Sequence, residues 1–230
     1  MLNRSDEHTE RQGLRCSIAD TQEARDQVYR LRYTGYFRRG SIDAREDERF
    51  SDHFDATPNH FSFLVRDSED EAVATMRISG VRQDLGWTQS PGGTVFGDHT
   101  AFQNLMAEGF VEASRLVFAP QARRDALMQL LGYMAAMADF YEVEWLMACP
   151  RMEHSAMYQR LFGFRPITAP RPYHGVKFET QLLAVRRSEL KDLCARGEAD
   201  EEGVGTGADE SSGVSAVSVR RAGLRPILTE

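Results

Sequence analysis

An apolar helical stripe between two apolar segments constrains the fold of this chain more than any other feature. Between residues 127 and 141, apolar side chains recur at the three- and four-residue spacing of one helix face. They are Leu127, Leu130, Leu131, Met134, Met137, Ala138 and Tyr141. Val111–Phe118 before the stripe and Trp145–Cys149 after it have the length and composition of buried strands. The chain therefore predicts a helix between two strands, with the helix packed on a core.

Shorter patterns predict the elements on either side. Strands are expected at Leu14–Ile18, Phe61–Arg66, Val73–Ser79 and Val176–Val185, and helices from Asp20 into the Arg32 region and over His154–Leu161. Asp20 and Glu23 have the spacing of a capping box, and Gly163 ends the later helix. Residues 38–55 and 86–97 are expected to be long loops, which in compact domains are usually functional. This order of elements predicts a mixed α+β domain.

Composition divides the 230 residues into three expected parts. These are a flexible N-terminus over 1–13, one domain over 14–196, and an acidic low-complexity tail over 197–230 that we expect to be disordered. Six acids and no Lys or Arg lie between Glu198 and Ser212, so most of the net charge of −7 belongs to the tail. The domain itself is nearly neutral, which argues against a nucleic-acid partner.

The remaining composition bears on the compartment. No apolar run approaches the roughly 20 residues that cross a bilayer, and the first residues lack the apolar region of a secretory signal. Cys16, Cys149 and Cys194 are widely spaced, match no metal pattern, and predict plain thiols in a reducing compartment. We therefore expect a cytoplasmic protein with no transmembrane segment and no metal site. Contact with a membrane surface stays open.

Four charged motifs are candidates for a functional site. They are Arg32 in VYRLRY, Asp52 and Asp55 in DHFD, Arg77 in ATMRIS, and Glu112, Ser114 and Arg115 in EASR. Alternation along a strand places Arg77 on the face opposite Met76 and Ile78. Glu112 and Arg115 are three residues apart, so only a bulge would bring both to one side of the sheet. Each motif alone is most simply a set of exposed surface charges. Together, however, the motifs supply three acids and three arginines, which allow one network of balanced charge.

In this order the motifs resemble those of acyl-homoserine lactone (autoinducer) synthases and, more closely, the related N-acyl amino acid synthases. The resemblance covers roughly Val28 to Val185. The helix ending Tyr158 to Phe164, Y-x-x-x-x-G-F, also resembles the wider GNAT superfamily. The resemblance implies an α/β/α sandwich, the GNAT acyl-CoA N-acyltransferase-like fold. In that fold a central mixed sheet contains Val111–Phe118 and Trp145–Cys149 as neighbouring strands that splay apart.

The resemblance also implies an activity. It is N-acyl transfer of a medium or long fatty acyl group from an acyl carrier protein thioester to the amine of an amino acid or similar small amine. Autoinducer synthases usually carry a Trp shortly after the position of Arg32, where this chain has Tyr33, Tyr36 and Phe37. Acetyl-CoA enzymes carry a glycine-rich pyrophosphate loop where this chain has the glycine-free Gln121–Ala126. Both departures favour an amino-acid acceptor and a carrier-protein donor.

The resemblance implies roles for individual residues, with no bound cofactor. Glu112 would be the general base, acting through a water molecule. Backbone N–H groups of Leu116, Val117 and Phe118 would hold the thioester carbonyl and the 4′-phosphopantetheine arm. Arg32, Arg77 and Arg115 would organise the acidic loop, with one of them binding a carboxylate, while Asp52, Asp55 and Ser114 hold them in place. Arg123 and Arg124 would contact the acidic carrier protein.

Several alternatives stay open at this point. The charged network could be scaffold alone, since ion-pair networks often have no catalytic role. Met128, Leu131, Met134 and Met137 could line an acyl tunnel, although a core explains the same stripe. His154 and Cys149 are given no catalytic role. Other candidate functions are an acyl-homoserine lactone synthase, an acetyl-CoA-dependent GNAT N-acetyltransferase and a non-catalytic GNAT-like binding module.

Overall fold

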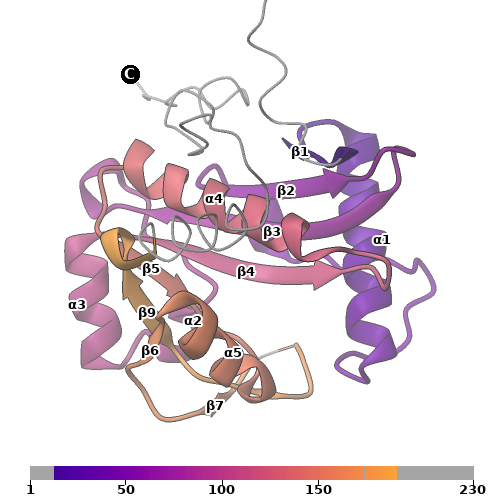
Figure 1. The fold of residues 1–230 in the computed structure, drawn as a ribbon. Helices are drawn as coiled ribbons and strands as arrows, with labels where there is room; N and C mark the ends of the chain where they lie inside the picture. Colours follow the sequence, from indigo (N-terminus) through magenta and orange to yellow (C-terminus); the bar gives the residue numbers. More distant parts are fainter. Residues whose placement is uncertain (1–12, 174, 191–230) are drawn as a thin grey trace, which may run out of the picture.

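The computed structural model describes residues 13–173 and 175–190 (Figure 1). The acidic tail predicted for 197–230 therefore lies outside the described residues, as does the predicted N-terminal segment except for Gly13. Within the described ranges no helix is long and apolar enough to cross a membrane.

A mixed sheet of seven strands forms the centre of the domain. Its spatial order is β1 (Arg15–Ile18), β2 (His60–Arg66), β3 (Ala72–Val81), β4 (Phe110–Phe118), β5 (Trp145–Ala148), β9 (Leu183–Arg186) and β6 (Arg165–Pro166). The β4–β5 pair is parallel and the other pairs are antiparallel. A separate two-stranded hairpin is made by β7 (Arg171–Pro172) and β8 (Glu179–Thr180).

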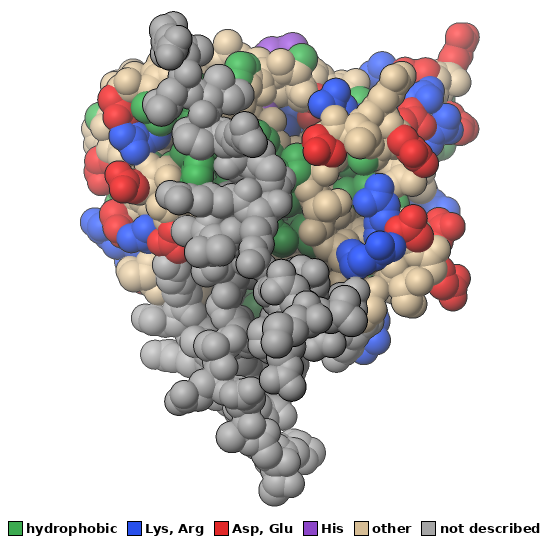
Figure 2. Space-filling model, turned by 90° about the horizontal axis from the view of Figure 1, so that it is seen from above, with side chains coloured by type: hydrophobic (Ala, Val, Ile, Leu, Met, Phe, Trp, Pro, Cys, Tyr) green, Lys and Arg blue, Asp and Glu red, His purple; other side chains and the backbone are tan. Residues whose placement is uncertain are grey.

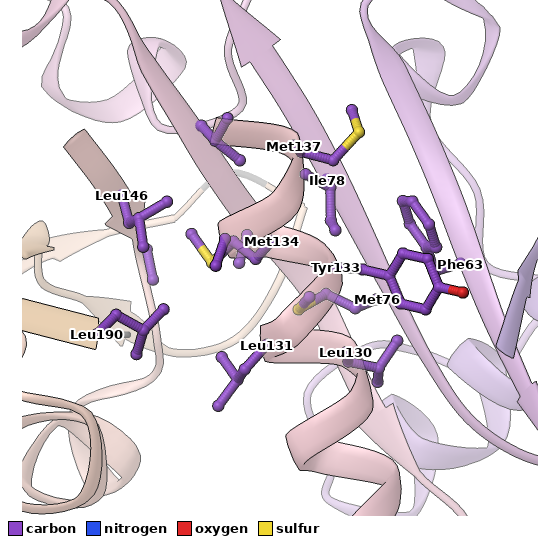
Figure 3. Close-up of a cluster of buried hydrophobic side chains, with 14 of the residues drawn as sticks. Phe63, Met76, Ile78, Leu130, Leu131, Tyr133, Met134, Met137, Leu146 and Leu190 are labelled. Carbon is purple, nitrogen blue, oxygen red and sulfur yellow. The ribbon is translucent and has the colours of Figure 1, made fainter. Parts of the chain in front are cut away.

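Helices cover both faces of this sheet. The helices are α1 (Gln22–Arg38), α2 (Gly93–Phe96), α3 (Thr100–Glu108), α4 (Arg124–Phe140) and α5 (Met152–Phe162), with 3-10 turns η3 (His53–Ala56) and η4 (Gln83–Leu85). The α4 helix packs on the face that carries Met76 and Ile78 (Figure 3). The α1 helix contacts β3 and β4 from the other side. The predicted α/β/α sandwich is confirmed.

The apolar stripe of α4 is core. Leu131, Met134 and Met137 are almost completely buried in the main hydrophobic cluster. In Figure 3 they lie among side chains of the neighbouring strands, including Met76 and Leu146. These positions fit the core alternative, since packed apolar side chains fill the interface between α4 and the sheet.

The prediction that β4 and β5 are neighbours in one mixed sheet is confirmed, and they run parallel. Backbone pairing between β4 and β5 runs from Phe110 with Trp145 to Ala113 with Ala148 and ends there. The β5 strand ends at Ala148, whereas β4 continues to Phe118 (Figure 1). The β4 backbone beyond Ala113 therefore has no β5 partner.

The expected bulge is also present, in β4. Thr75 pairs with Val117, but Arg77 pairs with Ser114, so β4 has one residue more than β3 over this stretch. Arg115 lies in this interval and has a φ of 55°, in the left-handed region. Such an extra residue bends the strand and turns its side chain out of strict alternation.

Some boundaries differ from the sequence predictions. The first helix begins after Thr21, not Asp20, because the Thr21 hydroxyl accepts the Ala24 N–H at 3.1 Å. It also extends past the predicted end, to Arg38. The helix α3 lies in a segment for which we predicted no element. It buries only Phe102 and Leu105, too few apolar side chains for a visible helical period.

The predicted last strand, Val176–Val185, is wrong as a single element. The chain forms β8, leaves the strand at Gln181, and then forms β9 in the other sheet. The break is stabilised at Thr180, whose hydroxyl donates to the Pro150 carbonyl at 2.8 Å. The two-residue strands β6 and β7 were not predicted either, since such short pairings have no recognisable period.

Candidate active site

The two aspartates of the DHFD motif are the N-cap and the third residue of one helical turn, η3. Asp52 is its N-cap and accepts the Phe54 N–H at 3.0 Å, while Asp55 accepts the Asp52 N–H at 3.1 Å. This reciprocal capping fixes the directions of both carboxylates. The turn holds them against the face of the sheet opposite α4.

Three arginines from three different elements converge on these carboxylates. Arg32 Nη1 lies 2.8 Å from Asp55, and Arg77 Nη1 lies 2.5 Å from Asp52 and 3.2 Å from Asp55. Arg115 Nη2 lies 2.7 Å from Asp52. The predicted motifs of α1, η3, β3 and β4 thus meet in one cluster, although they are far apart in the sequence.

Two serines complete the cluster. Arg32 Nη2 donates to the Ser62 hydroxyl at 2.7 Å, and Arg77 Nε donates to the Ser114 hydroxyl at 3.1 Å. Ser62 and Ser114 are directly opposite Arg77 on the two neighbouring strands. Ser62 was not predicted, although its place opposite Arg77 follows once the register of β2 and β3 is known.

The cluster is nearly closed to solvent. The side chains of Arg32 and Arg77 are fully buried, whereas 9% of Arg115 and 20% of Asp52 are exposed. Burial raises the pKa of Asp52, but Arg77 and Arg115 outweigh it and hold that pKa well below its usual range. Both aspartates are therefore ionised at neutral pH.

Aromatic rings surround the exposed side of Arg115. Its guanidinium carbon lies 4.3 Å from the ring centre of Phe50, 5.4 Å from that of Tyr36 and 6.0 Å from that of Tyr173. These rings come from α1, the loop after it and the β7–β8 hairpin. Tyr36 belongs to the segment in which autoinducer synthases carry a Trp. We did not predict Tyr173, since an isolated tyrosine in a loop gives no signal.

Glu112 lies apart from the ion pairs. It is fully buried on β4 and accepts the Ser90 hydroxyl on one oxygen and the Gly92 N–H, at 2.9 Å, on the other. Within the described chain it forms no ion pair with an arginine, so the expected network of three acids and three arginines is reduced to two acids. The reason is local: the Ser90–Gly93 turn supplies the donors for the carboxylate.

The environment of Glu112 suits proton transfer. Burial raises the pKa of Glu112 to about 7, against the opposing effects of Ser90, Arg77 and Gly92. A carboxyl group with a pKa near the working pH can accept and return a proton efficiently. This carboxyl group is the principal candidate for acid–base chemistry in the described chain.

Gly92 is required by close packing. A Cβ atom at this position would lie 2.8 Å from Met147, 3.1 Å from Cys149 and 3.3 Å from Glu112. The backbone N–H can therefore reach the carboxylate only because residue 92 has no side chain. The Ser-Pro-Gly-Gly sequence signals a turn, but nothing in it indicates that Glu112 is its partner.

The other predicted site residues lie outside the charged cluster. Leu116, Val117 and Phe118 form the end of β4 beyond its pairing with β5. Arg123 caps α4 and Arg124 begins it, both exposed. Burial raises the pKa of the Cys149 thiol well above its usual value, which disfavours a nucleophilic thiolate. No group of described His, Cys, Asp or Glu side chains is arranged to hold a metal ion.

The site thus combines a mixed sheet, a parallel β4–β5 pair and a buried carboxylate on β4. The family of N-acyl amino acid synthase FeeM matches residues 27–186. The chain therefore belongs to this family and is an N-acyltransferase. No curated protein sequence matches the chain significantly.

Solved structures agree on the fold. FeeM, an N-acyl amino acid synthase from uncultured soil microbes, superimposes with a TM-score of 0.65 at 16% identity, over 81% of this chain and 97% of that one. The acyl-homoserine lactone synthase LasI gives 0.56 at 12% identity, over 86% and 98%. The CoA-dependent acyl-homoserine lactone synthase BjaI gives 0.54 at 16% identity, over 91% and 99%. The fold is thus shared by synthases of different products.

Proposed function

We propose that the protein transfers a medium or long fatty acyl group from acyl carrier protein to the amine of an amino acid. The observation that carries this proposal is the buried Glu112 carboxylate, whose pKa is raised to about 7 next to the last residue of β4 that pairs with β5. Family membership supports the N-acyl amino acid product. The compartment we propose is the cytoplasm, where an acyl carrier protein would be available.

In this proposal Glu112 takes a proton from the ammonium group of the acceptor, through a bridging water. The free amine then attacks the thioester carbonyl, and backbone N–H groups of Leu116–Phe118 stabilise the oxyanion. Collapse of the intermediate breaks the C–S bond, and the pantetheine thiol leaves with a proton. The products are an N-acyl amino acid and the free carrier protein.

Arg115 is our candidate for binding the carboxylate of the acceptor amino acid. Arg32 and Arg77 are fully buried, so Arg115 is the arginine of this cluster with an exposed surface. Two of its nitrogens bind Asp52, while Nη1 forms no hydrogen bond with any described residue. The surrounding aromatic rings would favour an acceptor with an apolar side chain.

The donor proposal rests on α4. Its first turn presents Arg123 and Arg124 to solvent, and Gln121–Ala126 has no glycine that would let a pyrophosphate approach the backbone. On the face shown in Figure 2, basic and acidic side chains are interspersed. A local pair of arginines, not a broad basic field, would therefore attract the acidic carrier protein.

The donor can be tested by measuring kcat/KM with one acyl chain presented on carrier protein and on CoA, together with acetyl-CoA. We expect the carrier-protein thioester to be preferred and acetyl-CoA to be poor. Reversing both charges, Arg123→Glu with Arg124→Glu, should raise KM for the acylated carrier protein about tenfold, because charge complementarity speeds encounter.

The control is Arg160→Glu, a reversal of an exposed arginine on α5. It should leave KM unchanged, and the double reversal should leave turnover of a free acyl-pantetheine thioester unchanged. Efficient acetyl transfer from acetyl-CoA would contradict the donor assignment. Mass spectrometry of the products with mixed amino acids identifies the acceptor.

A further inference from the structure

A row of buried polar side chains crosses the sheet and ends at Glu112. His60 on β2 is directly opposite Ser79 on β3, and Ser79 is directly opposite Glu112 on β4. Side chains directly opposite one another share a face, with Cβ atoms about 4.5 to 5.5 Å apart. Ser79 and Glu112 are fully buried and His60 is 7% exposed. The three polar groups therefore occupy one enclosed strip.

Two atoms in this row are unsatisfied. His60 Nε2 and Ser79 Oγ are buried, and neither has a hydrogen-bond partner within the described ranges. Buried polar atoms without partners destabilise a folded protein, so most are paired with protein atoms or with ordered water. Both atoms lie on the side of the sheet that carries Glu112, in register with it.

The neighbours of His60 determine which ring nitrogen carries the proton. Its Nδ1 lies 2.5 Å from the Thr57 hydroxyl and 2.8 Å from Asn59 Oδ1. The Thr57 hydroxyl donates to the Phe54 carbonyl at 2.8 Å, so its oxygen is left to accept. The Asn59 amide nitrogen donates to two carbonyls, one of them Gln89 at 3.1 Å, which fixes its Oδ1 as the acceptor. The proton is therefore on Nδ1, and Nε2 presents a lone pair.

The segment 89–92 closes the other side of the row. The Gln89 carbonyl accepts a hydrogen bond from Asn59, the residue before His60. The Ser90 hydroxyl donates to Glu112. Gly92 packs against Met147 of β5. This segment thus crosses from β2 to β5 over the polar strip. His60, Ser79 and Glu112 are therefore buried between the sheet and this segment.

We propose that His60 Nε2, Ser79 Oγ and the Glu112 carboxylate hold one buried water molecule beneath the segment 89–92. The water would donate one hydrogen to Nε2 and the other to the carboxylate, and would accept the hydrogen of Ser79. Three hydrogen bonds are typical of a buried water, and this arrangement satisfies every unpaired atom in the row. Its consequence for catalysis rests on the proposed function, but its existence does not.

The water has a defined effect on the acid–base behaviour of Glu112. A hydrogen bond donated to a carboxylate favours its ionised form, so the water keeps the pKa of Glu112 lower than burial alone would set it. Arg77, Asp52, Tyr173 and Cys149 also interact electrostatically with Glu112. These groups stay in place when Ser79 is changed.

His60 does not titrate in the pH range in which Glu112 titrates. Burial and the charge of Arg77 lower the pKa of His60 to about 3, against the opposing effects of Asp52 and Asp55; His53 adds to the lowering. The imidazole is therefore neutral wherever Glu112 changes its charge. A shift seen near neutral pH can then be assigned to the Glu112 carboxyl group.

The test is Ser79→Ala, with the ionisation of Glu112 followed by its carboxyl infrared band and assigned by subtracting Glu112→Gln. With the water in place, losing Ser79 removes one of its partners. The pKa of Glu112 should then rise by about one unit, and the midpoint of urea unfolding should fall. If no water is bound, the change deletes an unsatisfied hydroxyl, so the titration stays the same and the midpoint stays the same or rises. That result would overturn the proposal.

The matched control is Thr75→Val, which removes a buried hydroxyl from the same face of β3. The Thr75 hydroxyl donates to the Phe63 carbonyl at 2.8 Å, so this variant should lower the unfolding midpoint without moving the Glu112 titration. A high-resolution crystal structure of the unaltered protein tests for the water molecule independently of any variant. Water within hydrogen-bond distance of both His60 Nε2 and Ser79 Oγ supports the proposal, and its absence there overturns it.

None of these readouts requires turnover. If the protein fails to acylate amino acids but Ser79→Ala shifts the Glu112 titration, the proposed function is wrong and the water site stands. If acylation is observed but the titration is unchanged, the water site is wrong and the proposed function stands.

Discussion

Glu112→Gln is expected to lower kcat by about a hundredfold or more while the protein stays folded. The amide keeps the shape of the carboxyl group: its oxygen can accept the Gly92 N–H, and its nitrogen can donate to the Ser90 oxygen. It cannot take a proton. The measurement is single-turnover acyl transfer, normalised to the folded fraction.

The same variant should also change how the free energy of unfolding depends on pH. Because the folded-state pKa of Glu112 is raised, its contribution to stability is full below the unfolded pKa near 4.5 and is lost as pH rises through about 7. A shift of this size corresponds to roughly 3 kcal/mol. Glu112→Gln should therefore be more stable than the unaltered protein at about pH 8, and the difference should disappear near pH 4.5. A catalytically normal variant with a lower melting temperature would mean that Glu112 is only scaffold.

Asp55→Asn is expected to cost about 3 to 5 kcal/mol of unfolding free energy, the largest stability effect in the site. Asp55 binds Arg32 and Arg77, both fully buried, and caps η3 through the Asp52 N–H. An amide leaves the arginines short of one negative charge inside the protein. Its nitrogen also cannot accept from Asp52. Urea unfolding at neutral pH measures the loss.

Asp43→Asn is the control, since it removes a carboxylate from the exposed ion pair with Lys177. That variant should change the free energy of unfolding little.

The stability contribution of Asp55 depends on pH. The pKa of Asp55 is lowered in the folded protein, because Arg32 and Arg77 outweigh the effect of burial. The contribution of Asp55 to stability is therefore present above its usual pKa and is lost on acidification. The difference between Asp55→Asn and the unaltered protein should therefore shrink as pH falls below about 4. A loss under about 1 kcal/mol at neutral pH would show that the pairs contribute little.

The central elements of the fold were predictable because each has a strong period. The stripe of α4 and the apolar β5 that follows it leave few alternatives for their packing. Arg77 was placed on the correct face by alternation alone, opposite Met76 and Ile78. The elements that were missed are α3 and the two-residue strands, which bury too little to leave a pattern. Val176–Val185 has strand composition throughout, so its break at Gln181 is decided by tertiary contacts.

The site was predictable only in part. Charge and order along the chain suggested that the DHFD aspartates and three arginines would meet, and they do. What the sequence does not reveal is which acid is paired. Glu112 has the same charge as Asp52, yet its partners are Ser90 and a backbone N–H from a turn with no charged residue. The sequence also did not predict that His60 and Ser79 lie in a row with Glu112, because that arrangement depends on the register of three strands.

The most direct test of the account is the pH dependence of kcat/KM for acyl transfer, compared between the unaltered protein and Glu112→Gln. With a saturating acylated carrier protein and the amino acid varied, kcat/KM of the unaltered protein should rise with pH through an apparent pKa near 7, the pKa of the buried Glu112 carboxyl group before the amino acid binds. In Glu112→Gln this limb should be absent, leaving the dependence set by the amine of the acceptor. An identical limb in both proteins would contradict the assignment of Glu112 as the base.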